Sequence, residues 1–348
     1  MKRINVIING FGRIGRAVLR CANKDSRINI IGINDINEDV DDLIYCYNYD
    51  KLVNIFNKYP KIIKKNDNVY FKNKKIEFFN IKNILGFRKI KNLDLIVDCS
   101  GVSSSKKDWK KLTFLNKKLK ILFTFDHPIS EMVMVLGANE KSYKNTYKFI
   151  SSSICDSTAL APFLKLIEKN FQILGGHVTT VHPILNYQNL LDGRSSSSSY
   201  PGTTFSGYSL GRSSLDNIIP KPTTALKVTG KSLENFKISK ISSFSYRVPT
   251  TIVGSADISL VLKKNFTINQ ILKLVKNEKK NQKFKIFDIN FLPKVSSDYY
   301  TNEHSLIYDH NWTSKSGNML HVVIWYDNEN GYSSRVVDQI NVIRSKMK

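Results

Sequence analysis

Short apolar runs alternate with amphipathic segments over the first part of the chain. A largely β-branched run at 4–8 is followed by a glycine-containing turn, an amphipathic stretch at 17–20 and a second apolar run at 28–33. Such runs are typical of parallel strands buried on both faces, and parallel strands require a crossover helix. The pattern therefore predicts a β-α-β unit. Further strand-like runs at 94–98 and 120–123 continue the α/β alternation to about residue 150.

The pattern changes beyond residue 150. Residues 160–171 have helical spacing, and residues 176–181 alternate in the manner of a strand. The runs 242–248 and 256–262 are predicted to be paired strands, and 336–347 a C-terminal helix. A Ser/Gly/Tyr-rich stretch at 193–214, with five consecutive serines at 195–199, is interpreted as a long functional loop. With 348 residues, the chain is long enough for two domains, and the change of pattern places their division near residue 154.

The composition adds a large positive charge. The chain has 53 Lys and Arg residues against 29 Asp and Glu residues, a formal net charge of +24. A charge of this size is typical of proteins that bind nucleic acid or membrane surfaces. Here the lysines are spread over stretches such as 58–75, 106–120 and 263–285, and no nucleic-acid-binding motif accompanies them. We interpret them as solvated lysines on loops and outer helix faces, with a nucleic-acid groove as the lesser alternative.

Cysteine usage and hydropathy bear on the setting of the protein. The four cysteines are widely spaced, without the Cys/His spacing of a zinc site, so neither a disulfide framework nor a metal site is expected. No apolar run approaches the 18 residues of a membrane span. These features predict a protein of the reducing cytoplasm with no membrane partner.

A glycine motif follows the first predicted strand and begins the first predicted helix. Gly10, Gly12 and Gly15 form a G-x-G-x-x-G pattern, whose glycines allow a tight turn, close approach of a pyrophosphate, and close helix–strand packing. Asp35 follows the second strand, where its carboxylate would accept a hydrogen bond from a ribose 2′-hydroxyl and repel a 2′-phosphate. The motif therefore predicts an NAD site.

A cysteine and a histidine form the second candidate group. Cys155 begins a predicted helix, whose N-terminus would stabilise a thiolate and lower the pKa of the thiol. His182 ends a predicted strand, where an imidazole could take the thiol proton. Taken singly, either residue could serve only in packing. Together with a dinucleotide loop, they indicate oxidation of an aldehyde through a thiohemiacetal.

With these groups in place, the chain resembles the glyceraldehyde-3-phosphate dehydrogenase family over nearly its whole length. The resemblance implies an α/β fold with an N-terminal Rossmann domain of doubly wound parallel sheet at 1–154, joined by the C-terminal helix 331–348. It also implies an α+β catalytic domain at 155–330 with a mainly antiparallel sheet. The matching segments, in order, are 8–16, 33–35, 99–102, the segment around Cys155, 179–182, 216–220, 246–250 and 325–332.

The resemblance also implies roles for individual residues and an assembly. Cys155 would be the nucleophile and His182 its base. The assembly would be a homotetramer in which the loop 186–214 lies near a neighbour's cofactor. The residues implied in NAD binding are Gly10, Gly12, Arg13, Ile14, Gly15, Asp35, Thr124 and Asn328.

The chain departs from the family pattern where the substrate's phosphate groups would bind. Ile154 and Asp156 flank the nucleophile in place of small hydroxyl residues, Leu185 stands in place of a threonine, and Thr224 in place of a glycine. An ionised Asp156 facing the site would repel a phosphate. The substrate-binding residues that the resemblance implies are Ile154, Asp156, Leu185, Arg212, Thr223, Thr224 and Arg247.

Three functions remain open from the sequence. The first is phosphorylating oxidation of glyceraldehyde 3-phosphate, with inorganic phosphate attacking a thioester on Cys155. The second is oxidation of erythrose 4-phosphate or another sugar-derived aldehyde, with the thioester passing to water. The third, a remote alternative, is an RNA-binding protein with vestigial activity.

Overall fold

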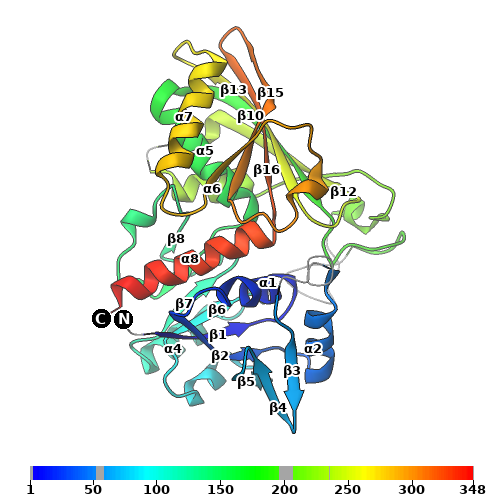
Figure 1. Cartoon of the computed structure of the whole chain (residues 1–348), viewed down its shortest axis with the longest axis vertical. Coiled ribbons are helices and arrows are strands. Elements are labelled where there is room, and N and C mark those ends of the chain that lie inside the picture. Colours follow the sequence, from blue (N-terminus) through cyan, green and yellow to red (C-terminus); the bar gives the residue numbers. More distant parts are fainter. Residues whose placement is uncertain (1–2, 52–58, 196–206, 235, 348) are drawn as a thin grey trace. The chain divides into compact units, whose positions relative to one another are not determined.

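A computed structural model describes residues 3–51, 59–195, 207–234 and 236–347 of the chain (Figure 1). The chain divides into two compact units. The first contains Met1–Met132, Tyr143–Ser152 and Val336–Lys348, and the second contains Val133–Ser142 and Ser153–Arg335. The serines at 196–199 and the rest of the loop up to residue 206 lie outside the described residues.

The first unit is built on a nine-stranded sheet in the order β3-β4-β5-β2-β1-β6-β7-β9-β8. Its centre is parallel, as the sequence predicts, because β2, β1, β6, β7 and β9 all pair in the parallel sense. Its elements are β1 (Ile4–Asn9), α1 (Arg13–Ala22), β2 (Ile28–Asn34), α2 (Val40–Asn48), β3 (Ile62–Lys65), β4 (Asn68–Phe71), β5 (Lys74–Phe79), β6 (Leu95–Asp98), α4 (Lys106–Leu115), β7 (Lys120–Phe123), β8 (Met132–Val133) and β9 (Phe149–Ser151).

Five strands of this sheet, β3, β4, β5, β8 and β9, were not expected from the sequence. β3, β4 and β5 form an antiparallel meander within the lysine-rich stretch 58–75 and just beyond it. Their apolar side chains Val69, Phe71 and Ile76 are buried, whereas Lys64 and Lys75 are exposed. The expectation that these lysines lie on loops and outer helix faces is therefore wrong, because several of them occupy the solvent side of strands. The lysines of 263–285, by contrast, do lie where expected: four are exposed on the helix Ile268–Asn281, and the other four are exposed in the segments that flank it.

The second unit contains a seven-stranded, mainly antiparallel sheet in the order β11-β12-β10-β13-β16-β15-β14. Helices α5 and α6 pack on it (Figure 1). Its elements are α5 (Cys155–Phe171), β10 (Ile173–Pro183), β11 (Ile219–Lys221), α6 (Ala225–Ser232), β12 (Ile241–Val248), β13 (Gly254–Leu262), α7 (Ile268–Asn281), β14 (Phe287–Asn290), β15 (Leu306–Ser316) and β16 (Met319–Tyr326). Helix α8 (Asn330–Lys346) begins in the second unit and continues into the first.

The strands β12 and β13 do not pair with each other, contrary to the sequence prediction. β10 lies between them, parallel to β12 and antiparallel to β13. The five residues 249–253 connect the two strands. A chain of five residues can reach about 16 Å, more than the roughly 10 Å across one intervening strand. The connection therefore steps over β10, and His182 at the end of β10 is enclosed by neighbours on both sides.

Within the part of the chain that the structure describes, the remaining regular structure consists of short 3₁₀ turns at Ile84–Lys89, Glu140–Ser142, Tyr208–Gly211, Ile238–Lys240 and Ser296–Tyr299. Among the residues that the structure describes, no helix has the length and apolar character needed to cross a membrane.

Candidate active site

The glycine loop between β1 and α1 has the shape of a dinucleotide-binding turn. Gly10 has a φ of +89°, and a Cβ there would lie 2.7 Å from the backbone of Ser100. A Cβ at Gly15 would lie 2.0 Å from the carbonyl oxygen of Gly10, so the helix can approach the loop only without a side chain. A Cβ at Gly12 would meet nothing within 4 Å. Two glycines thus serve packing, and Gly12 faces the open space that a pyrophosphate needs.

Asp35 holds this loop in place. Its Oδ2 accepts a hydrogen bond of 2.6 Å from the Phe11 backbone N–H, and its Oδ1 accepts one of 2.9 Å from the Asn37 N–H. Each carboxylate oxygen has a further lone pair, so Asp35 can still accept from a ribose hydroxyl. The predicted residues Arg13 and Ile14 begin α1 directly after the loop.

Thr124 and Asp98 lie at the same edge of the sheet. Asp98 is the last residue of β6, and Thr124 directly follows the last residue of β7. The Thr124 hydroxyl donates to the Asp98 carbonyl oxygen at 3.0 Å. The Asp98 carboxylate accepts from the Asn9 side chain at 2.8 Å, while its other oxygen is buried without a hydrogen-bond partner among the described residues. Burial raises the pKa of Asp98 to about 6. Ligands of open α/β sheets bind at this carboxyl edge.

Cys155 and His182 are brought together in the second unit. Cys155 is the first residue of α5, and Ser153 just before it has a left-handed φ of 71°, its carbonyl oxygen accepting from the Tyr332 hydroxyl. His182 lies near the end of β10 and is 4% exposed. The Cys155 Sγ and the His182 Nε2 are 3.6 Å apart. The pairing predicted from two distant motifs is therefore present in the fold.

The tautomer of His182 follows from its other nitrogen. Nδ1 lies 2.8 Å from the carbonyl oxygen of Pro183, which can only accept, so Nδ1 carries the proton. Burial, with the nearby positive charge of Arg247, lowers the pKa of His182 to about 4. The imidazole is therefore neutral at pH 7, and its unprotonated Nε2 faces the thiol as a base.

Asp156 lies in the site and faces the nucleophile. Its Oδ1 is 3.7 Å from the Cys155 Sγ and accepts a hydrogen bond of 2.7 Å from the buried Tyr326 hydroxyl. Burial and the Asp156 charge raise the pKa of Cys155 well above that of an ordinary thiol, although Arg247 opposes them. The expected lowering of the thiol pKa by the helix N-terminus is therefore wrong. A full negative charge and burial outweigh the partial positive charge of a helix end.

Strand pairing places two basic residues, Arg247 and Lys221, on the face of the sheet that carries His182. His182 lies opposite Arg247 on β12, and Arg247 lies opposite Ile219 on β11. Two residues along, Thr180, Ser245 and Lys221 form the next row of the same face. The Thr180 and Ser245 hydroxyls and the Arg247 Nε are buried without a hydrogen-bond partner among the described residues. Unpaired buried polar atoms of this kind indicate a place for water or ligand.

Lys221 is the functional candidate that the sequence reasoning missed. Burial and Arg247 lower the pKa of Lys221 to about 8, while Asp156 opposes them. Lys221 lies two residues along β11 from Ile219, so it belongs to the row next to that of His182. This placement depends on the strand order β11-β12-β10. The only signal in the sequence is that Lys221 directly follows the segment 216–220, which matches the family.

The other predicted substrate residues lie at varied places. Ile154 is the residue before α5, and Leu185 donates its backbone N–H to Gln188. The Thr223 hydroxyl accepts from the Ala225 N–H at the start of α6, and Thr224 is exposed. Arg212 is exposed and paired with Asp192 at 2.9 Å, so its described contacts do not join it to Cys155.

Asn328 also has a partner within its own unit. Its Oδ1 accepts a hydrogen bond of 2.9 Å from the buried backbone N–H of Val253. Val253 has a φ of 73°, which is strained for a β-branched residue. Asn328 therefore supports this turn, and its predicted contact with the nicotinamide stays a prediction.

The donor atoms of Cys155, Asp156 and His182 lie within 4.8 Å of one another. Zinc takes all three ligand types. The sequence did not predict this group as a metal site, and here its sulfur and imidazole already face each other as nucleophile and base.

Comparison with known proteins identifies the relatives of this chain. Residues 4–106 match the model of the glyceraldehyde 3-phosphate dehydrogenase NAD binding domain, and residues 154–328 match that of the C-terminal domain. Glyceraldehyde-3-phosphate dehydrogenase of Buchnera aphidicola is 33% identical over 99% of both chains. Glyceraldehyde-3-phosphate dehydrogenase 1 of Kluyveromyces marxianus is 34% identical over 97% of this chain and 98% of its own. The chain belongs to the glyceraldehyde-3-phosphate dehydrogenase family.

Membership confirms several sequence predictions. The chain is an NAD-dependent oxidoreductase of this family's type, and NAD is its cofactor. The two-part α/β fold, with a mostly parallel sheet in the first unit and a mainly antiparallel one in the second, is the predicted fold class.

Proposed function

We propose that the chain oxidises a phosphorylated aldehyde, glyceraldehyde 3-phosphate first, through a thioester on Cys155. The observation that carries the proposal is the Cys155 Sγ at 3.6 Å from the unprotonated Nε2 of His182. Because both groups are neutral at pH 7, the proton must pass from sulfur to nitrogen as the sulfur attacks. The names of the relatives support the choice of substrate.

The reaction divides into two parts. The Cys155 sulfur bonds to the aldehyde carbon as the thiol proton passes to His182. His182 then gives that proton to the carbonyl oxygen, so a thiohemiacetal forms and the imidazole is neutral again. Loss of a hydride and of the hydroxyl proton, the latter to His182, leaves a thioester. NAD, when bound, accepts the hydride. An acceptor then attacks the thioester carbon, the carbon–sulfur bond breaks, and the sulfur takes the proton from His182 to give the thiol again.

The residues of the first unit suit the proposed cofactor contacts. Gly12 gives room for the pyrophosphate, Arg13 and Ile14 lie at the helix N-terminus, and Asp35 offers a lone pair to the ribose. A carboxylate at this position disfavours a 2′-phosphate, which agrees with NAD.

The acceptor is inorganic phosphate in our first choice. Arg247 and Lys221 supply positive charge on the face that carries His182, and they stand in for the hydroxyl donors absent at Ile154 and Asp156. A second candidate acceptor, water, is favoured by Asp156. Its carboxylate lies 3.7 Å from the Cys155 Sγ, where it opposes an incoming phosphate and can take a proton from water.

The test is NADH formation from glyceraldehyde 3-phosphate and NAD, with and without phosphate. Phosphate-dependent turnover supports the first choice, and equal turnover without phosphate, with a free carboxylic acid as product, supports water. The same assay with erythrose 4-phosphate tests the alternative substrate. The proposal is overturned if neither aldehyde gives NADH, or if Cys155→Ser keeps full activity.

We also propose a homotetramer located in the cytoplasm. The resemblance to the family supports this assembly, in which the loop 186–214 lies near a neighbour's cofactor. Light scattering of the purified chain tests it, with a mass of about four chains expected. RNA binding stays a remote alternative, and steep loss of RNA affinity with salt, together with an inert Cys155, would favour it.

A further inference from the structure

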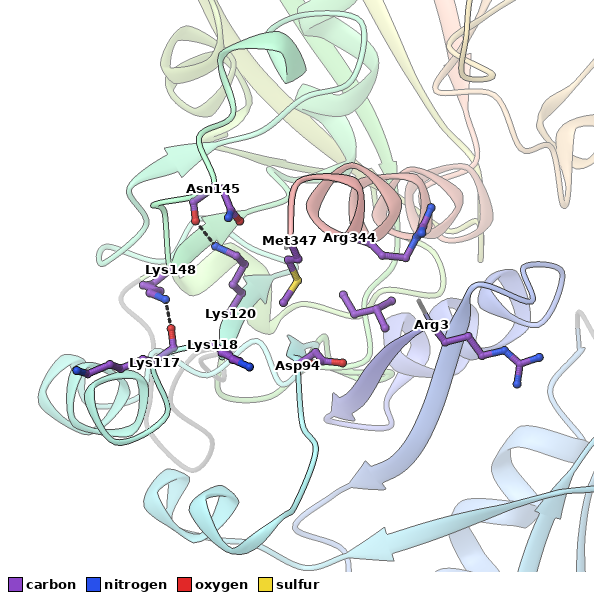
Figure 2. Close-up of a pocket in the computed structure, with 10 residues that line it drawn as sticks. Arg3, Asp94, Lys117, Lys118, Lys120, Asn145, Lys148, Arg344 and Met347 are labelled. Atoms are coloured by element: carbon purple, nitrogen blue, oxygen red, sulfur yellow. Dashed lines mark hydrogen bonds between the residues drawn. The ribbon is translucent and has the colours of Figure 1, made fainter. Parts of the chain in front are cut away.

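A basic cavity lies at the amino-terminal edge of the parallel sheet in the first unit (Figure 2). β1 begins at Ile4 and β7 begins at Lys120, whereas the glycine loop follows the carboxyl end of β1. The cavity therefore lies at the opposite edge of the sheet from the NAD loop. Its volume is about 210 Å³, and it is lined by Arg3, Ile4, Asp94, Lys117, Lys118, Lys120, Asn145, Lys148, Arg344 and Met347.

The wall of the cavity contains a buried cation without an ionic partner. Lys120 is 3% exposed, and its Nζ donates to the carbonyl oxygens of Asn145 at 2.5 Å and Tyr147 at 2.7 Å. No carboxylate pairs with Lys120 among the described residues. Burial, followed by the positive charge of Lys148, lowers the pKa of Lys120 to about 8. A buried lysine usually has a counter-charge, whereas the Nζ of Lys120 has two carbonyl oxygens and the ring of Tyr143, whose centroid is 6.0 Å away.

The neighbouring charges do not supply it. Lys148 Nζ donates to the carbonyl oxygen of Lys117, and Lys118 is exposed. The single carboxylate of the lining, Asp94, accepts a hydrogen bond of 2.9 Å from the Asn5 backbone N–H. Glu131, whose charge acts on Lys120 from outside the lining, accepts from the backbone N–H groups of Lys148 and Phe149. The lining thus has six basic residues and one acidic residue, although the side chains of Arg3, Lys117 and Arg344 point away from Lys120 (Figure 2).

We propose that this cavity binds a soluble polyanion, a phosphate or diphosphate group, alone or on a small metabolite. The anion would lie beside Lys120 and Lys148, with Lys118 at the exposed side and Ile4 and Met347 as an apolar wall. The cavity holds several times the roughly 30 Å³ that a water molecule occupies, enough for a group of this size. The site is separate from the dehydrogenase chemistry, so its test does not depend on turnover.

The experiment is calorimetric titration of the full chain with inorganic pyrophosphate, in the presence of saturating NAD to fill the dinucleotide site. We expect binding that weakens about tenfold or more in Lys118→Glu and in Lys120→Met, since each loses a charged contact. Lys118 is exposed, so Lys118→Glu tests the site even where Lys120→Met fails to fold. The matched controls are Lys273→Glu for Lys118→Glu and Lys273→Met for Lys120→Met. Each changes an exposed lysine of α7 in the other unit by the same charge and should leave the affinity unchanged.

Several results would overturn the proposal. If pyrophosphate binds the native chain and Lys118→Glu with equal affinity, the anion binds elsewhere. If the affinity falls equally in the Lys273 control with the same charge change, the effect is only a general one of net charge. Pyrophosphate could also fail to bind while an RNA oligonucleotide or anionic vesicles bind and lose affinity in Lys118→Glu. The basic surface would then belong to a macromolecule or membrane.

Discussion

Replacing Asp156 by Asn should increase the reactivity of the Cys155 thiol. The carboxylate oxygen lies 3.7 Å from the sulfur, and Asn retains an oxygen that can accept from the Tyr326 hydroxyl. At an effective dielectric constant of about 20, unit charges at this distance interact by about 4 kcal/mol, a factor of about 1000 in the ratio of thiolate to thiol. Arg247 and Lys221 offset part of this charge, so we take half of it as the lower bound.

The gain in rate is smaller than the gain in thiolate, because a thiolate of lower pKa is a weaker nucleophile. With a Brønsted coefficient of about 0.4 to 0.5, the alkylation rate at pH 7.5 should rise about 6- to 50-fold. Iodoacetamide is the reagent, and the peptide that contains Cys155 is followed by mass spectrometry. Peptide mapping is needed because Cys46 is also exposed to the reagent.

The matched control is Tyr326→Phe, which keeps the Asp156 charge and removes only the hydroxyl that donates to it. Its alkylation rate should not rise above the native rate, because the carboxylate charge that acts on the sulfur stays and loses a hydroxyl that partly neutralised it. An Asp156→Asn rate equal to or below the native rate would refute the electrostatic reasoning.

Three further predictions concern the base, the acceptor site and the sheet edge. His182→Gln should lower kcat about 10²- to 10⁴-fold in the NADH assay, since it removes the base; a change below threefold would contradict this role. Lys221→Met should raise the phosphate concentration for half-maximal rate about tenfold, and an unchanged value would exclude Lys221 from the acceptor site. The pKa of Asp98 is raised to about 6, so its contribution to stability falls as pH rises from about 4 to 6. Asp98→Asn should therefore gain up to about 3 kcal/mol relative to the native chain between pH 4 and 7 in urea unfolding, and a constant difference would contradict this.

Local patterns predicted much of the site because each part of it is encoded within a few residues. The glycine loop follows a β-branched strand and precedes a helix, and the structure has this arrangement at Gly10, Gly12 and Gly15. Cys155 begins a helix and His182 lies near the end of a strand, as their flanking residues indicated. The combination of motifs predicted that the two residues act as a pair, and in the structure the Cys155 Sγ and the His182 Nε2 lie 3.6 Å apart.

Features that depend on long-range pairing were not predictable in this way. Lys221 shares a face with His182 only because β12 lies between β11 and β10. The Tyr326 hydroxyl that bonds Asp156 is 170 residues away in the chain. The error on the thiol pKa has the same origin, because the helix N-terminus is local whereas the burial of Cys155 is a property of the folded unit. Lys120 was taken for a surface lysine because its burial at the sheet edge leaves no periodic signal.

The central claim is that Cys155 carries the substrate as a thioester after one hydride transfer. It is tested most directly by rapid mixing of the enzyme and NAD with glyceraldehyde 3-phosphate in the absence of phosphate, followed by acid quenching and mass mapping. The account predicts a burst of about one NADH per chain and an acyl adduct on the peptide that contains Cys155. A native chain that gives NADH without an adduct, or a Cys155→Ser chain that gives the same burst, would contradict it.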